Sequence, residues 1–192
     1  MRVEREDVTR EEVIRFYVRY DWPQKKLKDV EPPGMERWPW DDPNGIDQKL
    51  RDNELKEGVL SAYRKWNLVE FSVADLLECA VVNQIFPRKP QALGQLVLLG
   101  KLAEWLPTGA PKWWRLIGNG SELDVESALI VRPALKSEAP AKWYLEDGSG
   151  RALALLQRIL RYGEAGRTAW VYLGHEPDGR SAFIKSHPEL TR

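Results

Sequence analysis

The stretch Lys-Trp-Tyr-Leu-Glu-Asp-Gly-Ser-Gly-Arg at residues 142–151, followed by an apolar run over 152–160, is the most informative part of this chain. It predicts a short strand, a tight glycine turn and the first turn of a helix. In that geometry, backbone N–H groups and the positive end of the helix dipole point at one place, which can hold a phosphate group without a dedicated side chain. The sequence therefore predicts an anion-binding turn here.

The candidate site is formed by six consecutive residues: Glu146, Asp147, Gly148, Ser149, Gly150 and Arg151. The two glycines allow the backbone to approach an anion closely, and Arg151 adds a planar fork of donors. Glu146 and Asp147 precede the turn, where a carboxylate can hold Mg²⁺ or accept a proton. An ordinary strand–turn–helix connection with a surface ion pair explains the same residues, because one glycine-rich turn is a weak signal.

Composition indicates a globular protein of the cytoplasm. The 192 residues are 43% hydrophobic and 30% charged, with a single cysteine, so we expect one domain over 1–192 and a reducing compartment. No apolar run of about eighteen residues predicts a membrane span, and the charged N-terminus lacks the apolar core of a signal peptide. The net charge is zero, which argues mildly against binding to the DNA backbone.

A second motif lies upstream, where Ala-Leu-Ile-Val-Arg-Pro at 128–133 predicts a strand about ten residues before the strand at 143–146. Together with Asp147-Gly148-Ser149-Gly150-Arg151 and the alanine-bearing helix from Ala152, it resembles the ParB/sulfiredoxin superfamily. In that family a strand of the type PIVVRP precedes a strand, a turn and a helix. The resemblance covers about thirty-five residues and extends toward a β-branched and aromatic run at 168–174.

The resemblance implies an α+β fold and a nucleotide site. Gly148, Ser149, Gly150 and Arg151 would bind the phosphates of ATP or another nucleoside triphosphate. Arg151 and the helix start would stabilise charge during hydrolysis, while Glu146 or Asp147 positions water or Mg²⁺, with Asp147 as the metal ligand. The implied activity is ATP hydrolysis together with metal-dependent DNA cleavage.

In length the chain is similar to plasmid fertility-inhibition proteins of the Osa type, which block DNA transfer through a type IV secretion system. That similarity implies DNA and a secretion-system protein as partners.

The chain also departs from the family pattern. The sulfiredoxin turn carries a catalytic cysteine, whereas this turn has Ser149 and Gly150, and Cys79 lies far away in sequence. Gly150 stands where partition proteins have the first of two arginines. About forty residues follow Arg151, too few for a helix-turn-helix domain, so a complete chromosome-partition protein is not expected.

Two other functions fit the same residues. One is a non-catalytic module that binds a protein or DNA, in which exposed tryptophans engage the partner; the chain has nine tryptophans. The other is a serine-type small-molecule kinase with Glu146 as the base.

Patterning over the rest of the chain predicts a mainly helical and loop-rich portion at 1–110 and an α+β portion at 111–192. Thr9 opens a helix with a capping-box pattern, residues 52–66 predict a second helix, and Ser72 caps a third that runs to Phe86. The run 92–106 fits either a helix or a strand plus a helix. The proline-rich stretch 21–44 contains three tryptophans and predicts a long loop near the phosphate site.

Overall fold

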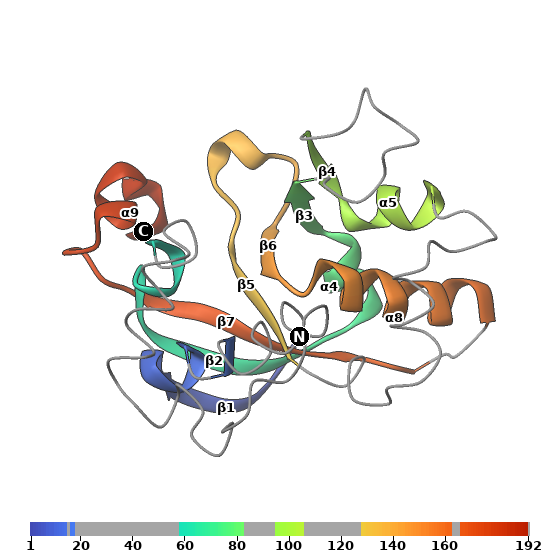
Figure 1. The fold of residues 1–192 in the computed structure, drawn as a ribbon, viewed down its shortest axis with the longest axis horizontal. Coiled ribbons are helices and arrows are strands. Elements are labelled where there is room, and N and C mark those ends of the chain that lie inside the picture. Colours follow the sequence, from blue (N-terminus) through green and yellow to red (C-terminus); the bar gives the residue numbers. More distant parts are fainter. Residues whose placement is uncertain (15, 18–57, 83–94, 106–127, 163–165, 192) are drawn as a thin grey trace, which may run out of the picture. The chain divides into compact units, whose positions relative to one another are not determined.

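The computed structural model describes residues 1–14, 16–17, 58–82, 95–105, 128–162 and 166–191. The chain divides into two compact units, one formed by Met1–Glu6 and Asn67–Gly174 and the other by Asp7–Trp66 and His175–Arg192. A seven-stranded mixed sheet has the order β1-β2-β7-β5-β6-β3-β4 (Figure 1). Within the described residues, no helix is long and apolar enough to cross a membrane.

The strands pair in both directions. β5 is antiparallel to β6 and parallel to β7, while β3 is parallel to β6 and antiparallel to β4. Their bounds are β1 Arg2–Thr9, β2 Tyr63–Phe71, β3 Cys79–Val82, β4 Leu96–Leu98, β5 Leu129–Pro133, β6 Trp143–Asp147 and β7 Ala169–Pro177. The α+β class is therefore confirmed.

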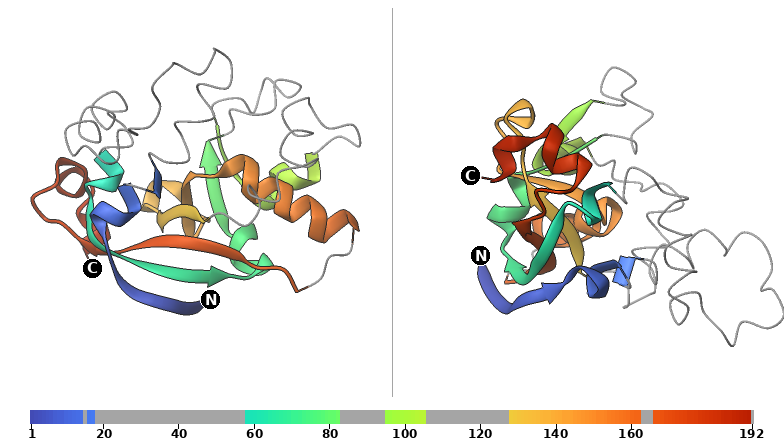
Figure 2. Two further views of the ribbon diagram at one scale, coloured as in Figure 1. Left: turned by 60° about the horizontal axis from the view of Figure 1, so that its bottom comes forward. Right: turned by 90° about the vertical axis from the view of Figure 1, so that its left-hand side faces the viewer.

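In the described part of the chain the strands are accompanied by the helices α4 Val73–Leu77, α5 Leu99–Trp105, α8 Ser149–Tyr162 and α9 Ala182–Ser186 and by the 3₁₀ turns η2 Lys136–Glu138 and η3 Pro188–Thr191. The helices α4, α5 and α8 contact one another (Figure 2). Their apolar side chains form one buried cluster with those of the neighbouring strands. Leu153 and Leu156 of α8 pack in this cluster with Val131, Leu145 and Val171, which anchors the start of α8 beside the end of β6.

The predicted order of strand, strand, helix and strand from Ala128 onward is confirmed by β5, β6, α8 and β7. In β5 the residues from Leu129 to Arg132 are all buried, and Leu129 and Val131 enter the apolar cluster together with Leu145 of β6. Ile130 is buried as well, on the other face of the strand. The amphipathic sequence of α8 supplies the matching apolar stripe. The local sequence signals were thus consistent with the tertiary structure in this segment.

The prediction of a mainly helical portion at 1–110 was wrong for the described residues. Residues 58–60 are helical, but β2 begins at Tyr63, inside the segment predicted as a helix. The buried side chains of β2 are Tyr63, Trp66, Val69 and Phe71. Three of these follow one another at intervals of three, which imitates one face of a helix although the backbone is extended.

The third predicted helix starts correctly and ends early. Ser72 Oγ accepts the N–H of Asp75 at 3.3 Å, and Asp75 Oδ2 accepts the N–H of Ser72 at 3.0 Å, which completes the capping box. The helix α4 nevertheless stops at Leu77, and β3 begins at Cys79. The apolar run of β3 is buried within the sheet, and such a run cannot be distinguished from a helix by periodicity.

The remaining N-terminal predictions have mixed outcomes. The run 92–106 contains the strand-plus-helix alternative, β4 followed by α5. Glu12 donates its N–H to Thr9 Oγ1 at 3.3 Å, and the residues that follow Thr9 are helical over 10–14 and 16–17, with Val13 and Tyr17 buried. The loop predicted at 21–44 and its tryptophans lie outside the described residues, and a single domain over 1–192 remains a prediction.

Candidate phosphate-binding turn and buried arginine cluster

The turn between β6 and α8 has the predicted geometry. Asp147 is the last residue of β6, Gly148 has φ +94°, and α8 starts at Ser149. The carbonyl of Gly148 accepts the N–H of Ala152 at 2.9 Å, which closes the first turn of the helix. A Cβ atom on Gly148 would lie 2.5 Å from Leu129 Cδ2, so both the backbone conformation and the packing require glycine.

The start of α8 has features that attract an anion. The first N–H groups of a helix have no acceptor within it, and Gly148 has no side chain that could cap them. The first turn of α8 contains no acidic residue that would neutralise the helix dipole. Gly148, Ser149 and Gly150 are partly exposed to solvent, so a ligand can reach this backbone.

The sequence predicted that the guanidinium of Arg151 would be available to a phosphate, but it forms an ion pair. Its guanidinium folds back along α8, where Nη2 lies 2.9 Å from Asp147 Oδ2. The side chains of Arg151 and Asp147 are 6% and 23% exposed. The Arg151 Nη2 atom also lies 2.9 Å from the position that a Cβ atom on Gly148 would take. Arg151 therefore covers part of the turn, and its guanidinium is already paired with Asp147.

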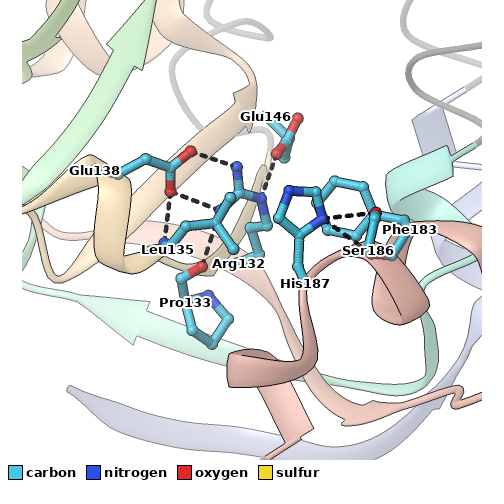
Figure 3. Close-up of polar contacts among 8 residues, drawn as sticks. All are labelled: Arg132, Pro133, Leu135, Glu138, Glu146, Phe183, Ser186 and His187. Atoms are coloured by element: carbon cyan, nitrogen blue, oxygen red, sulfur yellow. Dashed lines mark hydrogen bonds and ion pairs between the residues drawn. The ribbon is translucent and has the colours of Figure 1, made fainter.

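Glu146 belongs to a second arrangement, a buried cluster around Arg132 (Figure 3). Arg132 Nε donates to Glu146 Oε1 at 2.7 Å, and the two terminal nitrogens donate to both oxygens of Glu138 at 2.8 and 2.7 Å. Nη1 also donates to the carbonyl of Pro133 at 3.0 Å, and the guanidinium lies 4.2 Å from the ring centroid of Tyr144. We refer to Arg132, Glu138, Tyr144 and Glu146 as the Arg132 cluster.

The Arg132 cluster is electrostatically tight. The side chain of Arg132 is 5% exposed, and those of Glu138 and Glu146 are 11% and 16% exposed. Burial alone would lower the pKa of Arg132, but the hydrogen bond with Glu138 and the charges of Glu146 and Glu138 outweigh it and raise the pKa. Glu138 also accepts the N–H of Leu135 at 2.6 Å. The cluster thereby fixes η2 and the segment between β5 and β6.

Sequence reasoning used Arg132 as part of a motif but missed this role, and it missed Glu138 and Tyr144 altogether. The sequence signal that could have indicated the cluster is an arginine at the end of one strand, followed by polar side chains at every second position of the next strand, Tyr144 and Glu146. Tyr144 lies opposite Arg132 in the register of β5 and β6. That register became visible only once the two strands were paired.

The predicted metal site has no preformed set of ligands in the described residues. Asp147 and Glu146 pair with different arginines, and the described part of the chain contains no group of three or more His, Cys, Asp or Glu residues arranged to hold a metal ion. A Mg²⁺ ion at Asp147 would compete with Arg151 and would take its other ligands from phosphate oxygens and water.

Neither Cys79 nor Ser186 has the surroundings of a catalytic nucleophile. Cys79 is buried, and burial, followed by the charges of Asp75 and Glu78, raises the pKa of its thiol to about 12. His187 Nδ1 lies 3.0 Å from Ser186 Oγ and 2.9 Å from the carbonyl of Phe183 (Figure 3). Ser186 Oγ donates to that same carbonyl at 2.9 Å, so this hydroxyl is engaged at the end of α9. The burial and the raised pKa of the Cys79 thiol disfavour thiolate chemistry at that residue.

Comparisons of this chain with protein-family models, with curated proteins and with solved structures give no match.

Proposed function

We propose that the chain binds the phosphate groups of a nucleoside triphosphate, such as ATP, at residues 148–151. One observation carries the proposal: a glycine with positive φ leads directly into a 14-residue helix whose first turn contains no acidic residue. The backbone N–H groups of Ser149, Gly150 and Arg151 are the proposed donors, and the helix dipole adds to their attraction for an anion.

The ion pair between Arg151 and Asp147 suggests how such a ligand would be accommodated. The phosphate would take Arg151 from Asp147, and the released carboxylate would bind Mg²⁺ jointly with phosphate oxygens. Arg151 and the helix start would then stabilise the charge that develops during hydrolysis. Glu146 is held by Arg132 at 2.7 Å, which favours Asp147 over Glu146 as the group that positions Mg²⁺ or water.

Phosphate binding is tested by placing a negative charge at the helix start. Ser149→Asp is expected to keep or raise the melting temperature, because an acidic residue in the first turn favours the helix dipole. The same charge should lower ATP affinity at least tenfold by repelling phosphate. Ala182→Asp makes the matched change at the first residue of α9, which is exposed. Titration calorimetry with ATP, ADP and inorganic phosphate would compare the two; equal affinities for both variants would refute the site.

The finer activity follows from the family resemblance: ATP hydrolysis coupled to metal-dependent DNA cleavage in the cytoplasm, which would suppress DNA transfer through a type IV secretion system. Supercoiled plasmid incubated with the protein and Mg²⁺, with and without EDTA, tests the cleavage. Nicking is expected with Mg²⁺ alone, since a metal ion is the proposed means of stabilising the phosphodiester transition state. Equal nicking in EDTA would exclude the metal role.

A second candidate function is a non-catalytic binding module. The observation that favours it is that both Arg151 and Glu146 already form ion pairs, so the turn can be purely structural. Failure of wild-type protein to bind ATP in the titration above would select this function. The serine-type kinase is less well supported, because Glu146 would have to leave Arg132 to act as a base.

A further inference from the structure

The strand β1 lies at one edge of the sheet and is exposed to solvent. It stands at the end of the strand order, and no described strand pairs with its outer side. Seven of its eight residues are exposed, with Val8 as the exception. Edge strands are in general templates for pairing with another strand. The opposite edge strand, β4, has only three residues.

The charges of β1 restrict which strand can pair with it. Its sequence from Arg2 to Asp7 is Arg-Val-Glu-Arg-Glu-Asp, and Val3 is the single uncharged residue in that stretch. In an antiparallel pair of identical strands, opposite side chains lie on the same face. The two-fold axis must therefore lie midway between one residue and the same residue of the other copy. That residue is then its own partner, and we name each axis by it. An axis through any residue of this stretch other than Val3 would place like charges opposite each other.

The register centred on Val3 is complementary. It places Arg2 of each copy opposite Glu4 of the other and brings the two Val3 side chains together. Within one chain Arg2 Nη2 lies 3.8 Å from Glu4 Oε2, and these side chains are 77% and 48% exposed, so each can exchange this long contact for one with the other copy. Val3 is 43% exposed. This register uses only residues 1–5, which precede the positive φ of 55° at Asp7. An axis at Val8 would need extended backbone beyond Thr9, where residues 10–14 are helical, and it would include the positive φ of 55° at Asp7.

We propose that β1 pairs with β1 of a second copy of this chain, antiparallel and centred on Val3, to form a two-fold symmetric dimer. The contact is isologous, because the same five residues contribute from both copies. Two Arg2–Glu4 pairs and one Val3–Val3 pair give the register, and backbone hydrogen bonds join the strands. The interface is short, so we expect a reversible dimer whose population depends on protein concentration. This proposal does not depend on nucleotide binding.

Charge exchange tests both the dimer and its register. Arg2→Glu and Glu4→Arg, each alone, convert two attractive pairs into two repulsive ones and are expected to weaken dimerisation about tenfold or more. The double variant R2E/E4R restores the complementary pairs and should restore the dimer to within about threefold of wild type. Lys185→Glu, an exposed charge reversal in α9, is the control and should leave dimerisation unchanged.

Sedimentation velocity over a hundredfold range of concentration would measure the monomer–dimer equilibrium, with any affinity tag placed at the C-terminus. Melting temperatures of all variants would show that each is folded. A wild-type protein that stays monomeric throughout would overturn the proposal. A dimer that is insensitive to both single changes would exclude β1 as the interface, and a double variant that stays monomeric would exclude the register centred on Val3.

Discussion

Arg151 and Asp147 form an ion pair across the turn that leads into α8, with 2.9 Å between Nη2 and Oδ2. Because Arg151 follows Asp147 by one helical turn, the pair ties the first turn of α8 to the end of β6. The same arginine is also the side chain best placed to meet a phosphate at this turn. One residue thus serves the structure in the absence of ligand and is a candidate contact in its presence.

Replacing Arg151 with alanine is expected to destabilise the protein and to weaken ATP binding. The loss of a partly buried, charge-assisted hydrogen bond costs about 1–3 kcal/mol of unfolding free energy. If Arg151 also contacts phosphate, ATP affinity falls about ten- to a hundredfold. Urea unfolding and ATP titration on the same variant would measure both quantities.

Asp147→Asn is the companion variant, because it weakens the same ion pair and leaves the guanidinium in place. We expect it to lower stability as well, but to strengthen ATP binding in the absence of Mg²⁺ by releasing Arg151. Lower stability in both variants with unchanged ATP affinity in both would assign the pair a structural role alone.

Replacing Arg132 with methionine is expected to cost about 3–5 kcal/mol of unfolding free energy, because Glu138 and Glu146 would remain as buried charges without their partner. Chemical denaturation monitored by tryptophan fluorescence would measure the loss. Lys101→Met is the control, since the side chains of Lys101 and its partner Glu104 are 60% and 62% exposed, and exposed pairs contribute about 1 kcal/mol or less. Equal effects of the two changes would contradict the importance of the Arg132 cluster.

Gly148→Ala should destabilise the protein through backbone strain and through a steric clash. Gly166 allows the two effects to be measured separately. Gly148 and Gly166 both have positive φ, at 94° and 84°, but only Gly148 has atoms within 4 Å of an added Cβ. Gly166→Ala is expected to cost about 1 kcal/mol from backbone strain alone. Gly148→Ala adds the clash with Leu129 and should cost about 1–3 kcal/mol more. Thermal unfolding of both variants measures the difference, and similar losses would argue against the tight packing at Gly148.

The capping box of α4 predicts a pH-dependent contribution to stability. Burial would raise the pKa of Asp75, but hydrogen bonds from Ser72 and the N-terminal ammonium group more than offset this and lower the pKa below its ordinary value of 3.8. Because the folded-state pKa is the lower one, the contribution is fully present above about pH 4 and is lost as the pH falls through the folded-state pKa.

The corresponding experiment compares wild type with Asp75→Asn from pH 7 to pH 2. The variant should be less stable by about 0.5–2 kcal/mol at neutral pH, the usual worth of a helix cap, and the difference should vanish at the acidic end. Glu104→Gln, at an exposed pair with Lys101, should show almost no difference at any pH. A gap between wild type and Asp75→Asn that persists at pH 2 would contradict the assignment.

The C-terminal part of the fold could be predicted from sequence because its signals are local. The short apolar run at 129–133, the strand at 143–147, the glycine of positive φ at 148 and the amphipathic helix from Ser149 each depend on neighbouring residues. The strand β7 followed from the same kind of signal, since Trp170 and Val171 lie in a β-branched and aromatic run. The capping box at Ser72 was likewise readable, because it involves two side chains three residues apart.

Only the tertiary structure showed that β2 and β3 are strands, and that the described N-terminal residues are therefore not mainly helical. Tyr63, Trp66 and Val69 are spaced by three residues, as on one face of a helix, but the pairing of β2 between β1 and β7 makes the segment a strand. The partners of Arg132, Glu146 and Arg151 were also decided there. A sequence fixes which residues can form ions, whereas burial and the register of β5 against β6 determine which charges meet. Local structure can therefore be predicted from neighbouring residues, but strand pairing and ion pairing depend on residues that the fold brings together.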